Sequence, residues 1–599
     1  MFKLLKRLNA KEVAMIIASV AFICAQVWME LEIPSYMSDI ISLLQEKGTT
    51  SSDILNPGSK MIMLSLLSFA SAVFVGFLAS HVAAGFTTRL RKDVFNGVMD
   101  YSQTEIKKFS IPSLLTRTTN DMTQIQMFFT MGLQVVIKGP IQAVWAITKI
   151  AGESGEWLLA TVVAVAVVAV MLLALLTLAF PKQKLIQTLT DKLNSLTREM
   201  LTGLRVIRAY NAEDYENEKF AQANDEVTRL NLFVNRVMAF MSPVMTVVAS
   251  GLTLSIYWIG AYLINDVSIP TDMTKIASAV QDRVGVYSDM IVFSSYAMQV
   301  VMGFMLMIAI FLILPRTIVS AGRVNEVLSL SPSIQFPDET KETKTQTGQV
   351  EFKNVSFRYA KNSADVIEHI SFTAKEGETV AFIGSTGSGK STLVNLIPRF
   401  YDTTGGSILI DGIDIRKYSR EDLNNIIGYI PQKAVLFSGT IKSNLDFGDS
   451  NESPLSDEKM WDSLELAQSR SFIETKEGKL DAHVAQGGSN FSGGQKQRLA
   501  ISRALARKPE IIIFDDSFSA LDYKTDSQLR QDLNKHTSQM TKLIVAQRIS
   551  TIMDADQILV LDEGKVVGQG THRELLESNT VYQEIAYSQL SKEELENGK

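Results

Sequence analysis

Long runs of apolar residues without a single charge dominate the first half of the chain. Four such runs cover residues 61–80, 157–180, 237–264 and 290–314. Each is long enough to cross a hydrocarbon core, which needs about 20 helical residues. A shorter run at 13–29 is within range, and a sixth at 131–148 qualifies if Lys138 snorkels or faces the bundle interior. The pattern predicts six membrane-spanning helices.

The segments between several of these runs carry a helical pattern of their own. Residues 182–236 contain no proline, and their apolar side chains recur at helical spacing from Leu185 to Met200. Spans four and five are therefore expected to continue as helices far beyond the membrane and to meet near "GLRVIRAYNAED". Residues 89–130 have the same character, with Pro112 as the single expected interruption. Such extensions are either solvated hairpins or rods that transmit motion to the spans.

The pattern changes after a polar segment, "SPSIQFPDETKETKTQTGQ", whose composition is that of a linker. The part that follows has the mixture of apolar strands and amphipathic helices of a soluble α/β domain. We therefore expect an α-helical transmembrane domain at 1–330, a linker at 331–349, and an α/β nucleotide-binding domain of the P-loop class at 350–599.

Charge and cysteine content narrow the class and the orientation. A net charge of −6 argues against a nucleic-acid-binding protein, and a single cysteine, Cys24, excludes an intrachain disulfide. Basic residues precede the first run and separate the second from the third, whereas the segment 30–60 offers only Lys47 and Lys60. The positive-inside rule then places both termini in the cytoplasm. No small-residue cleavage site follows the first run, so we interpret it as an uncleaved anchor.

One motif in the second half binds phosphate. The stretch "TVAFIGSTGSGKSTL" joins an apolar strand to a helix through the pattern G-x-x-x-x-G-K-S. Its glycines let backbone N–H groups surround phosphates, while Lys390 reaches the β and γ phosphates and Ser391 ligates Mg²⁺. The nucleotide-binding residues expected here are Gly384, Ser385, Thr386, Gly387, Ser388, Gly389, Lys390, Ser391 and Thr392.

Two further stretches belong with the phosphate loop. In "IIIFDDSFSALD" a buried strand ends at Asp515, the usual second carboxylate near Mg²⁺. In "NFSGGQKQR" a Ser-Gly-Gly turn opens a helix and forms a second anion cradle. Because the chain already has one cradle, the second implies a nucleotide held by another polypeptide.

With these motifs the whole chain resembles a half-transporter of the ATP-binding-cassette (ABC) exporter family. The resemblance implies two nucleotide domains that meet head to tail and enclose two ATP molecules with Mg²⁺, each between one phosphate loop and the other domain's signature. It assigns Tyr359 to adenine stacking, Gln432 to Mg²⁺ and the spans, and Asp522 to the dimer contact. The signature residues it implies are Ser492, Gly493, Gly494 and Gln495. The segments "TRTTNDM" and "GLRVIRAYNAED" resemble coupling helices.

Two positions depart from the family pattern. The residue after the Mg²⁺ aspartate is normally glutamate, which orients the attacking water, and here it is Asp516. The switch histidine is replaced by Gln547, which can donate a hydrogen bond but cannot become a cation. Aspartate is shorter by about 1.5 Å, and a misplacement near 1 Å costs on the order of a hundredfold in rate. The pair either consists of tolerated variants or marks the degenerate half of a heterodimeric bacterial multidrug exporter, which we favour.

The expected partners follow from the same resemblance. They are a second, non-identical half-transporter, the lipid bilayer of a bacterial cell membrane, and small amphipathic cargo, with no nucleic acid. Methionines of the last two spans, including Met298 and Met302, suit apolar cargo of varied shape, although bundle packing explains them equally well. The alternatives are a homodimeric lipid or drug flippase and an ATP-gated channel or sensor of the same architecture.

Overall fold

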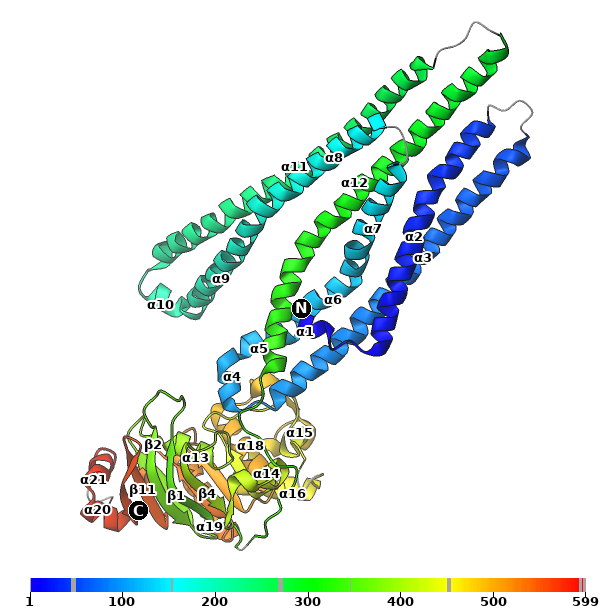
Figure 1. Cartoon of the computed structure of the whole chain (residues 1–599). Coiled ribbons are helices and arrows are strands. Elements are labelled where there is room, and N and C mark those ends of the chain that lie inside the picture. Colours follow the sequence, from blue (N-terminus) through cyan, green and yellow to red (C-terminus); the bar gives the residue numbers. More distant parts are fainter. Residues whose placement is uncertain are drawn as a thin grey trace. The chain divides into compact units, whose positions relative to one another are not determined.

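The structure, a computed structural model, describes residues 2–44, 50–151, 155–267, 273–344, 346–449, 454–591 and 595. Contacts between residues divide the chain into two compact units (Figure 1). We call Met1–Met99 with Ile111–Leu330 the helical unit, and Asp100–Ser110 with Ser331–Lys599 the mixed unit. Each unit is described by itself below.

The helical unit consists of long α-helices joined by short connections. Its helices are α1 (Phe2–Leu5), α2 (Ala10–Leu43), α3 (Ser51–Met99), α5 (Ile111–Thr118), α6 (Asn120–Met127), α7 (Leu133–Ile150), α8 (Gly155–Ala174), α9 (Phe180–Thr202), α10 (Leu204–Ala209), α11 (Glu213–Asp266) and α12 (Met273–Ser329). Five-residue π-helical turns, Phe128–Gly132 and Leu175–Ala179, join α6 to α7 and α8 to α9. The helical class that the sequence predicts is confirmed.

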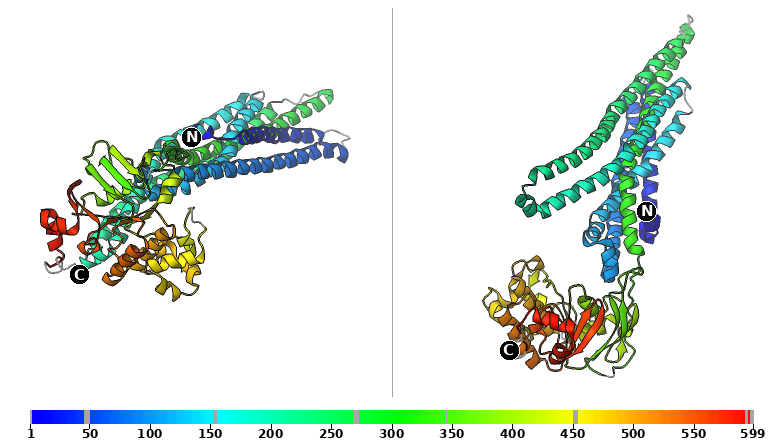
Figure 2. Two further views of the ribbon diagram at one scale, coloured as in Figure 1. Left: turned by 90° about the horizontal axis from the view of Figure 1, so that it is seen from below. Right: turned by 90° about the vertical axis from the view of Figure 1, so that its left-hand side faces the viewer.

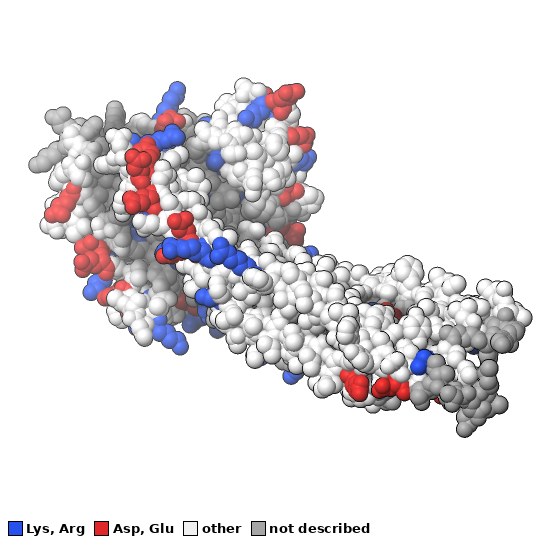
Figure 3. All heavy atoms as spheres, turned by 90° about the horizontal axis from the view of Figure 1, so that it is seen from above, with Lys and Arg blue, Asp and Glu red and all other residues white. Residues whose placement is uncertain are grey.

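The six predicted spans are also confirmed, because six helical segments of the described part of the chain are long and apolar enough to cross a membrane. They are Ala10–Leu43, Ser51–Met99, Ile111–Ile150, Gly155–Thr202, Glu213–Asp266 and Ser278–Met307. Long stretches of these helices carry no charged side chain on the face that Figure 3 shows. The third span qualifies only if the charge of Lys138 is accommodated. Lys138 lies against the first span and donates a hydrogen bond to Glu30 at 2.9 Å.

The predicted extension of spans four and five is present. α9 ends at Thr202, the short α10 follows, and α11 begins at Glu213, so the turn lies within the predicted stretch. α9 and α11 contact each other and lie side by side in Figure 1 and in the right-hand view of Figure 2. The two helices therefore form a continuous antiparallel hairpin.

The prediction that Pro112 alone interrupts residues 89–130 is wrong. Helical structure is interrupted after Met99, at Ser110 and at Thr119. The segment therefore belongs to four helices, whereas a single interruption would have given two. Ser110 has a φ of 60° and a ψ of 146°, which lie outside the helical region, so α4 ends before it. Pro112 is the second residue of α5, where the missing N–H costs nothing because the first turn has no intrahelical acceptor for it.

The mixed unit contains two main sheets. A four-stranded sheet has the order β2-β1-β4-β5, and a six-stranded sheet has the order β12-β11-β3-β10-β9-β6. The strands are β1 (Val350–Phe357), β2 (Ile367–Ala374), β3 (Thr379–Gly384), β4 (Gly405–Ile410), β5 (Ile413–Asp414), β6 (Ile427–Ile430), β7 (Gly439–Thr440), β8 (His483–Val484), β9 (Ile511–Asp515), β10 (Thr541–Val545), β11 (Gln557–Asp562) and β12 (Lys565–Gly570). β7 and β8 pair separately.

The helices of the mixed unit complete an α/β fold. They are α4 (Gln103–Phe109), α13 (Lys390–Leu396), α14 (Arg420–Ile426), α15 (Ile441–Leu445), α16 (Asp457–Leu466), α17 (Arg470–Glu474), α18 (Gly493–Ala506), α19 (Tyr523–His536), α20 (His572–Ser578) and α21 (Thr580–Tyr587). β3, β9 and β10 are parallel neighbours, and every residue of β9 and β10 is buried. Because parallel strands end at one edge of a sheet, the loops after these three strands meet there.

Candidate nucleotide-binding site

The loop after β3 has a backbone that its glycines make possible. Gly387 and Gly389 have φ values of +89° and +96°, in the left-handed region that glycine adopts without strain. A Cβ at Gly384 would lie 2.0 Å from the carbonyl oxygen of Leu561, so no side chain fits there. The loop then enters α13 at Lys390, as the G-x-x-x-x-G-K-S pattern predicts. The curved backbone of this loop fits around a row of phosphate groups.

Lys390 lies inside this loop. Its Nζ donates to the carbonyl oxygens of Gly384 and Ser385 at 2.8 and 2.7 Å, and to Ser388 Oγ at 3.3 Å. Burial lowers the pKa of the Lys390 ammonium, and the nearby Asp516 carboxylate acts in the opposite direction. These acceptors are neutral, and charged phosphate oxygens bind an ammonium more strongly. The loop thus holds a cation where the β and γ phosphates of a nucleotide would lie.

Asp515 and Ser391 form the pair expected to hold Mg²⁺. Ser391 Oγ donates to Asp515 Oδ1 at 2.7 Å, and the Tyr429 hydroxyl donates to Asp515 Oδ2 at 3.3 Å. Burial raises the pKa of the Asp515 carboxyl, while these two hydrogen bonds oppose the rise. A divalent cation would favour the ionised form further. The donor set therefore fits Mg²⁺, a cation that prefers oxygen ligands.

Such an ion would depend on phosphate and water for most of its ligands. Among the residues that the structure describes, no group of three His, Cys, Asp or Glu side chains is arranged to hold a metal. Mg²⁺ in nucleotide sites usually keeps several waters and binds one or two protein groups together with phosphates. The sparse protein contribution here is consistent with that mode of binding.

The three residues expected at the reaction centre meet at one atom. Asp516 Oδ2 accepts hydrogen bonds from Gln432 Nε2 at 2.9 Å and from Gln547 Nε2 at 2.8 Å. Asp516 is 6% exposed, and its φ of 49° is unusual for a residue with a side chain. Its N–H donates to the carbonyl oxygen of Val545 at 3.0 Å, which fixes the turn after β9. The short carboxylate is thus held by two neutral amides, neither of which can take up a proton.

The signature segment lies at the start of α18. Ser492 caps the helix, because its Oγ accepts from the N–H of Gln495 at 3.3 Å. In return, Gln495 Oε1 accepts from the N–H of Ser492 at 3.0 Å. Gly493 and Ser492 are exposed, and a Cβ at Gly494 would lie 3.3 Å from the carbonyl oxygen of Ala520. The turn is well ordered by its own hydrogen bonds and presents its backbone to solvent.

Tyr359 lies beside the start of α13, next to the phosphate loop. Its hydroxyl shares a hydrogen bond of 2.9 Å with Thr392 Oγ1, and its ring is 43% exposed. Phe357 and Tyr401 contact the ring edge to face, and Lys107 Nζ lies 4.6 Å from the ring centroid. An exposed aromatic ring fixed in this way is suited to stacking with a flat base.

Asp522 is the N-cap of α19. Its carboxylate accepts from the N–H and the hydroxyl of Thr525 at 3.0 and 2.8 Å. These hydrogen bonds lower the pKa of the Asp522 carboxyl. The structure of one chain therefore gives Asp522 a capping role, and its expected contact with a partner remains a prediction.

Sequence reasoning missed three residues of this site. Tyr429 supports Asp515 from β6, and Lys107 reaches Tyr359 from α4, which is far away in the sequence. Gln589 Nε2 donates to the carbonyl oxygen of Gln547 at 2.8 Å and so fixes the switch segment from near the end of the chain. The strand position of Tyr429 is a usable signal, but neither Lys107 nor Gln589 lies in a motif.

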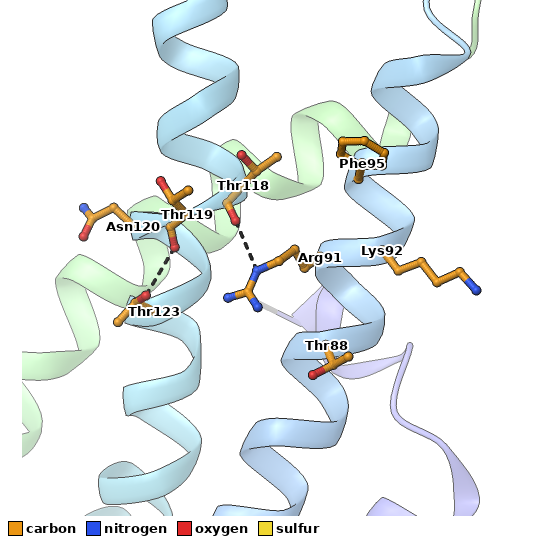
Figure 4. A pocket seen from close by; sticks show the side chains of 8 residues that line it. All are labelled: Thr88, Arg91, Lys92, Phe95, Thr118, Thr119, Asn120 and Thr123. Carbon is orange, nitrogen blue, oxygen red and sulfur yellow. Dashed lines mark hydrogen bonds between the residues drawn. The ribbon is translucent and has the colours of Figure 1, made fainter. Parts of the chain in front are cut away.

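Another hollow, outside the phosphate loop, has a different composition. It has a volume of about 840 Å³ and lies in the helical unit between α3 and the turn from α5 to α6, which includes most of "TRTTNDM". Figure 4 shows Arg91 reaching the carbonyl oxygen of Thr118, a hydrogen bond of 3.3 Å, with Lys92 pointing away. Neither a glycine loop nor a carboxylate lines it, so it lacks the groups that hold a nucleotide with Mg²⁺.

Comparisons with known proteins match both units. Residues 16–279 match the family described as "ABC transporter transmembrane region", and residues 367–519 match "ABC transporter". A Mycobacterium tuberculosis protein described as an uncharacterized ABC transporter ATP-binding protein is 38% identical over 562 residues, 93% of each chain. A Bacillus subtilis protein with the same description is 34% identical over 542 residues, 90% of each chain.

More distant relatives include proteins with a stated activity. An ATP-dependent lipid A-core flippase of Syntrophus aciditrophicus is 29% identical over 542 residues, which cover 89% of this chain and 86% of the flippase. A solved structure of a bacterial Atm1-family ABC exporter with ATP bound superposes with a TM-score of 0.77 at 22% identity. The superposition covers 97% of this chain and 100% of the exporter, so the two share a fold over their full length.

Proposed function

Because this chain belongs to the ABC transporter family, we propose that it is the catalytically impaired half of a heterodimeric exporter. It is a half-transporter of the exporter type, a multi-pass membrane protein that couples an ATP-binding domain to six candidate spans. The proposal adds that its own ATP site turns over slowly and that a second, non-identical half performs most of the hydrolysis.

One observation carries the proposal. The carboxylate of Asp516 stands where the family has a longer glutamate, and it is held by Gln432 and Gln547 at 2.9 and 2.8 Å. These two amide donors direct the carboxylate toward themselves. Without a histidine at position 547, no imidazolium is available to stabilise the charge that develops on the γ phosphate. Water would therefore be oriented poorly at this site.

The remaining residues of the site keep their roles in binding. The loop from Gly384 to Ser391 would surround the phosphates, Lys390 would neutralise their charge, and Tyr359 would stack on adenine. Ser391 and Asp515, with Gln432, would hold Mg²⁺, which when bound neutralises phosphate charge. ATP bound here contributes binding energy to the closed dimer even where its hydrolysis is slow.

The signature is intact, in contrast to the hydrolytic residues. Ser492 and Gln495 retain their reciprocal hydrogen bonds, and Gly493 and Gly494 leave the backbone open. In a head-to-tail dimer this turn would face the γ phosphate at the partner's site. The chain would therefore lend a working signature to a partner that supplies its own catalytic glutamate and histidine.

The proposed cargo is a small amphipathic or hydrophobic compound, of the multidrug type, moved out of a bacterial cell. The largely apolar spans and the exposed Met302 and Met305 of α12 offer apolar surface of adaptable shape. A homodimeric flippase is the second candidate, because lipid A-core flippases are among the relatives of this chain. An ATP-gated channel or sensor is the third, since a slow site suits gating as well.

The proposal is tested by comparing two variants in the complex that the chain forms in its native membrane. Asp516→Gln should change steady-state ATPase turnover by less than about twofold, because the site is already slow. Gly494→Asp should reduce turnover on the order of a hundredfold, because it places a carboxylate against the partner's γ phosphate. A severe loss in Asp516→Gln would show a working catalytic base and overturn the proposal.

Isolation of the complex separates the first two candidates. The full-length chain, extracted from native membrane with an affinity tag, should retain a second half-transporter of different sequence. Recovery of this chain alone, as a homodimer with ATPase activity, would favour the flippase. A further assay distinguishes both of these candidates from a channel. An exporter or flippase uses ATP to accumulate a dye across vesicle membranes, and a channel does not.

A further inference from the structure

A polar hollow lies among apolar helices of the helical unit. It has a volume of about 530 Å³ and is lined by side chains of α2, α7 and α12. These three helices contact one another, and Figure 1 shows α7 beside α12. Its polar lining includes Glu30, Lys138, Gln142 and Gln299, all within or next to segments that are apolar enough to span a membrane. Polar groups at such depth are expensive unless they serve a function.

An ion pair forms one side of the hollow. Lys138 Nζ, Gln26 Nε2 and Ser68 Oγ donate to the carboxylate of Glu30 at 2.9, 2.9 and 3.3 Å. All three hydrogen bonds end on Oε1, and no described residue donates to Oε2. Lys138 has three N–H groups, of which one is used in this bond. The ion pair therefore still offers a ligand one acceptor, Glu30 Oε2, and the remaining N–H donors of Lys138.

A glutamine forms the other side. Gln142 is 5% exposed, and its Nε2 donates to Gln299 Oε1. Its own Oε1 is fully buried and has no donor among the residues that the structure describes. A buried acceptor of this kind is normally paired, so one without a partner calls for an explanation. A ligand in the hollow with an N–H or O–H group would satisfy it after the Gln142 amide turns toward the hollow, because the oxygen itself is not exposed there.

We infer that this hollow binds the headgroup of a zwitterionic amphiphile whose cation carries N–H donors, of the phosphoethanolamine type. The ammonium donates to Glu30 Oε2 and Gln142 Oε1, and the phosphate accepts from Lys138. Glu30 and Lys138 are the only charged residues in the described lining. The lining therefore has no net charge and matches a ligand that has none either. Met298 and Met302 offer apolar contact for the rest of the amphiphile.

The inference rests on the proposed function, because it names the class of cargo that such an exporter would move. It excludes two related ligands on chemical grounds. A phosphocholine headgroup has no N–H donor and leaves Gln142 Oε1 unpaired. A phosphoglycerol headgroup has a net negative charge, which Glu30 repels. Only Lys138 would neutralise that charge, and Lys138 is already paired with Glu30.

The test measures binding directly, in the full complex in dodecyl maltoside, by native mass spectrometry with three lysolipids of equal chain length. Lysophosphatidylethanolamine should be retained at least about tenfold more strongly than lysophosphatidylcholine or lysophosphatidylglycerol. Equal retention of the three would overturn the inference. ATPase turnover is recorded in parallel with each lipid.

Variants locate the binding. Gln142→Leu, which keeps the side chain's size, and the double variant Glu30→Gln with Lys138→Gln, which leaves no unpaired charge, should each abolish the preference. Lys149→Met is the matched control, because Lys149 pairs with Glu32 at 2.9 Å outside the hollow. Melting temperatures identify any variant that fails to fold. A preference that persists in folded Gln142→Leu and in the folded double variant would overturn the site.

The two proposals fail in different ways. If lysophosphatidylethanolamine binds with the expected preference but never changes turnover or crosses the membrane, the site stands and the export function falls. If amphiphiles stimulate turnover equally in the wild type and in both variants, the export function stands and the site falls.

Discussion

At the scale of single residues, the proposed slow ATP site rests on one carboxylate, that of Asp516. Asp516 follows β9 with a left-handed backbone, and its N–H is fixed by the carbonyl oxygen of Val545. The backbone at Asp516 therefore cannot move toward the nucleotide to compensate for a side chain that is one CH₂ shorter than glutamate. Gln432 and Gln547 both donate to the same oxygen, which holds the carboxylate in place. Length and partners act together, so both must change to restore a catalytic base.

The first prediction restores both. Asp516→Glu combined with Gln547→His should raise ATP hydrolysis at this chain's site by about tenfold, because a general base within reach of water typically contributes 10²–10⁴-fold. The rate is measured in a complex whose partner carries Gln in place of its catalytic glutamate. Gln547→His alone serves as the control and should raise the rate little. No gain in the double variant would show that another feature limits the site.

The second prediction concerns Lys390. Lys390→Ala removes a cation whose hydrogen bonds to phosphate are worth about 1.5–3 kcal/mol, so the affinity of this site for ATP should fall about tenfold or more. Photo-crosslinking with an azido-ATP, followed by separation of the two chains, measures the affinity of each site. Lys535→Ala, at an exposed position of α19, should leave it unchanged. Unchanged labelling in Lys390→Ala would contradict the assignment of the phosphate loop.

At the scale of elements, an ion pair fixes the first two spans to each other. Glu12, in the first turn of α2, accepts two hydrogen bonds of 2.6 Å from the guanidinium of Arg89 on α3. Glu12 is 4% exposed, whereas the Arg89 side chain is 38% exposed. A bidentate pair of this geometry sets the register of the two helices as well as their distance.

The third prediction follows from this pair. Arg89→Leu leaves the carboxylate of Glu12 buried without its partner and should destabilise the helical unit by about 3 kcal/mol, the low end for a broken buried ion pair. The thermal midpoint, followed by circular dichroism in detergent, should fall clearly. Glu12→Gln with Arg89→Leu should recover part of the loss, since no charge remains buried.

An exposed pair between α3 and the turn before α2 is the control for that measurement. Arg7 and Asp93 lie 3.6 Å apart with about half of each side chain in solvent. Arg7→Gln should change stability by less than about 1 kcal/mol, as is usual for surface pairs. Equal losses in Arg7→Gln and Arg89→Leu would show that burial does not set the energy of these pairs.

At the scale of the whole molecule, the distribution of Lys and Arg predicts the orientation in the membrane. Both termini and the hairpin of α9 and α11 are expected in the cytoplasm, and the connection from α2 to α3 outside. Part of the predicted outer segment, 46–59, lies outside the described residues, and Thr50 to Ser59 is described. A single cysteine introduced at each place distinguishes the two sides.

The fourth prediction is the labelling result. In a background with Cys24→Ser, Ser52→Cys should react with an impermeant maleimide added to intact cells, and Glu218→Cys at the cytoplasmic hairpin should react only after the cells are opened. Both positions are exposed, so access rather than burial decides the reaction. Labelling of Glu218→Cys in intact cells would contradict the six-span orientation.

The sequence alone determined the architecture of both units, for a physical reason. A bilayer leaves backbone groups no partner except within a helix, so five uncharged runs and a sixth whose one charge is Lys138 predict six helices before any contact is known. The phosphate loop is equally local, because its glycines, lysine and serine act within one turn of chain. Residues 89–130 were predicted less well. Ser102 begins a helix by capping it, and Ser110 and Thr119 separate helices through their backbone conformation, and the apolar pattern records neither effect.

The tertiary structure decided what these residues contact. The motifs indicated that Asp516 and Gln547 were unusual, but only the fold brings them and Gln432 to a single oxygen, because parallel strands far apart in the sequence end at one edge of the sheet. In the same way, Lys138 is an isolated charge in the sequence and becomes one half of an ion pair when α7 lies against α2. Local pattern reflects the energy of single segments, whereas pairing of polar groups depends on distances that exist only after the segments have packed.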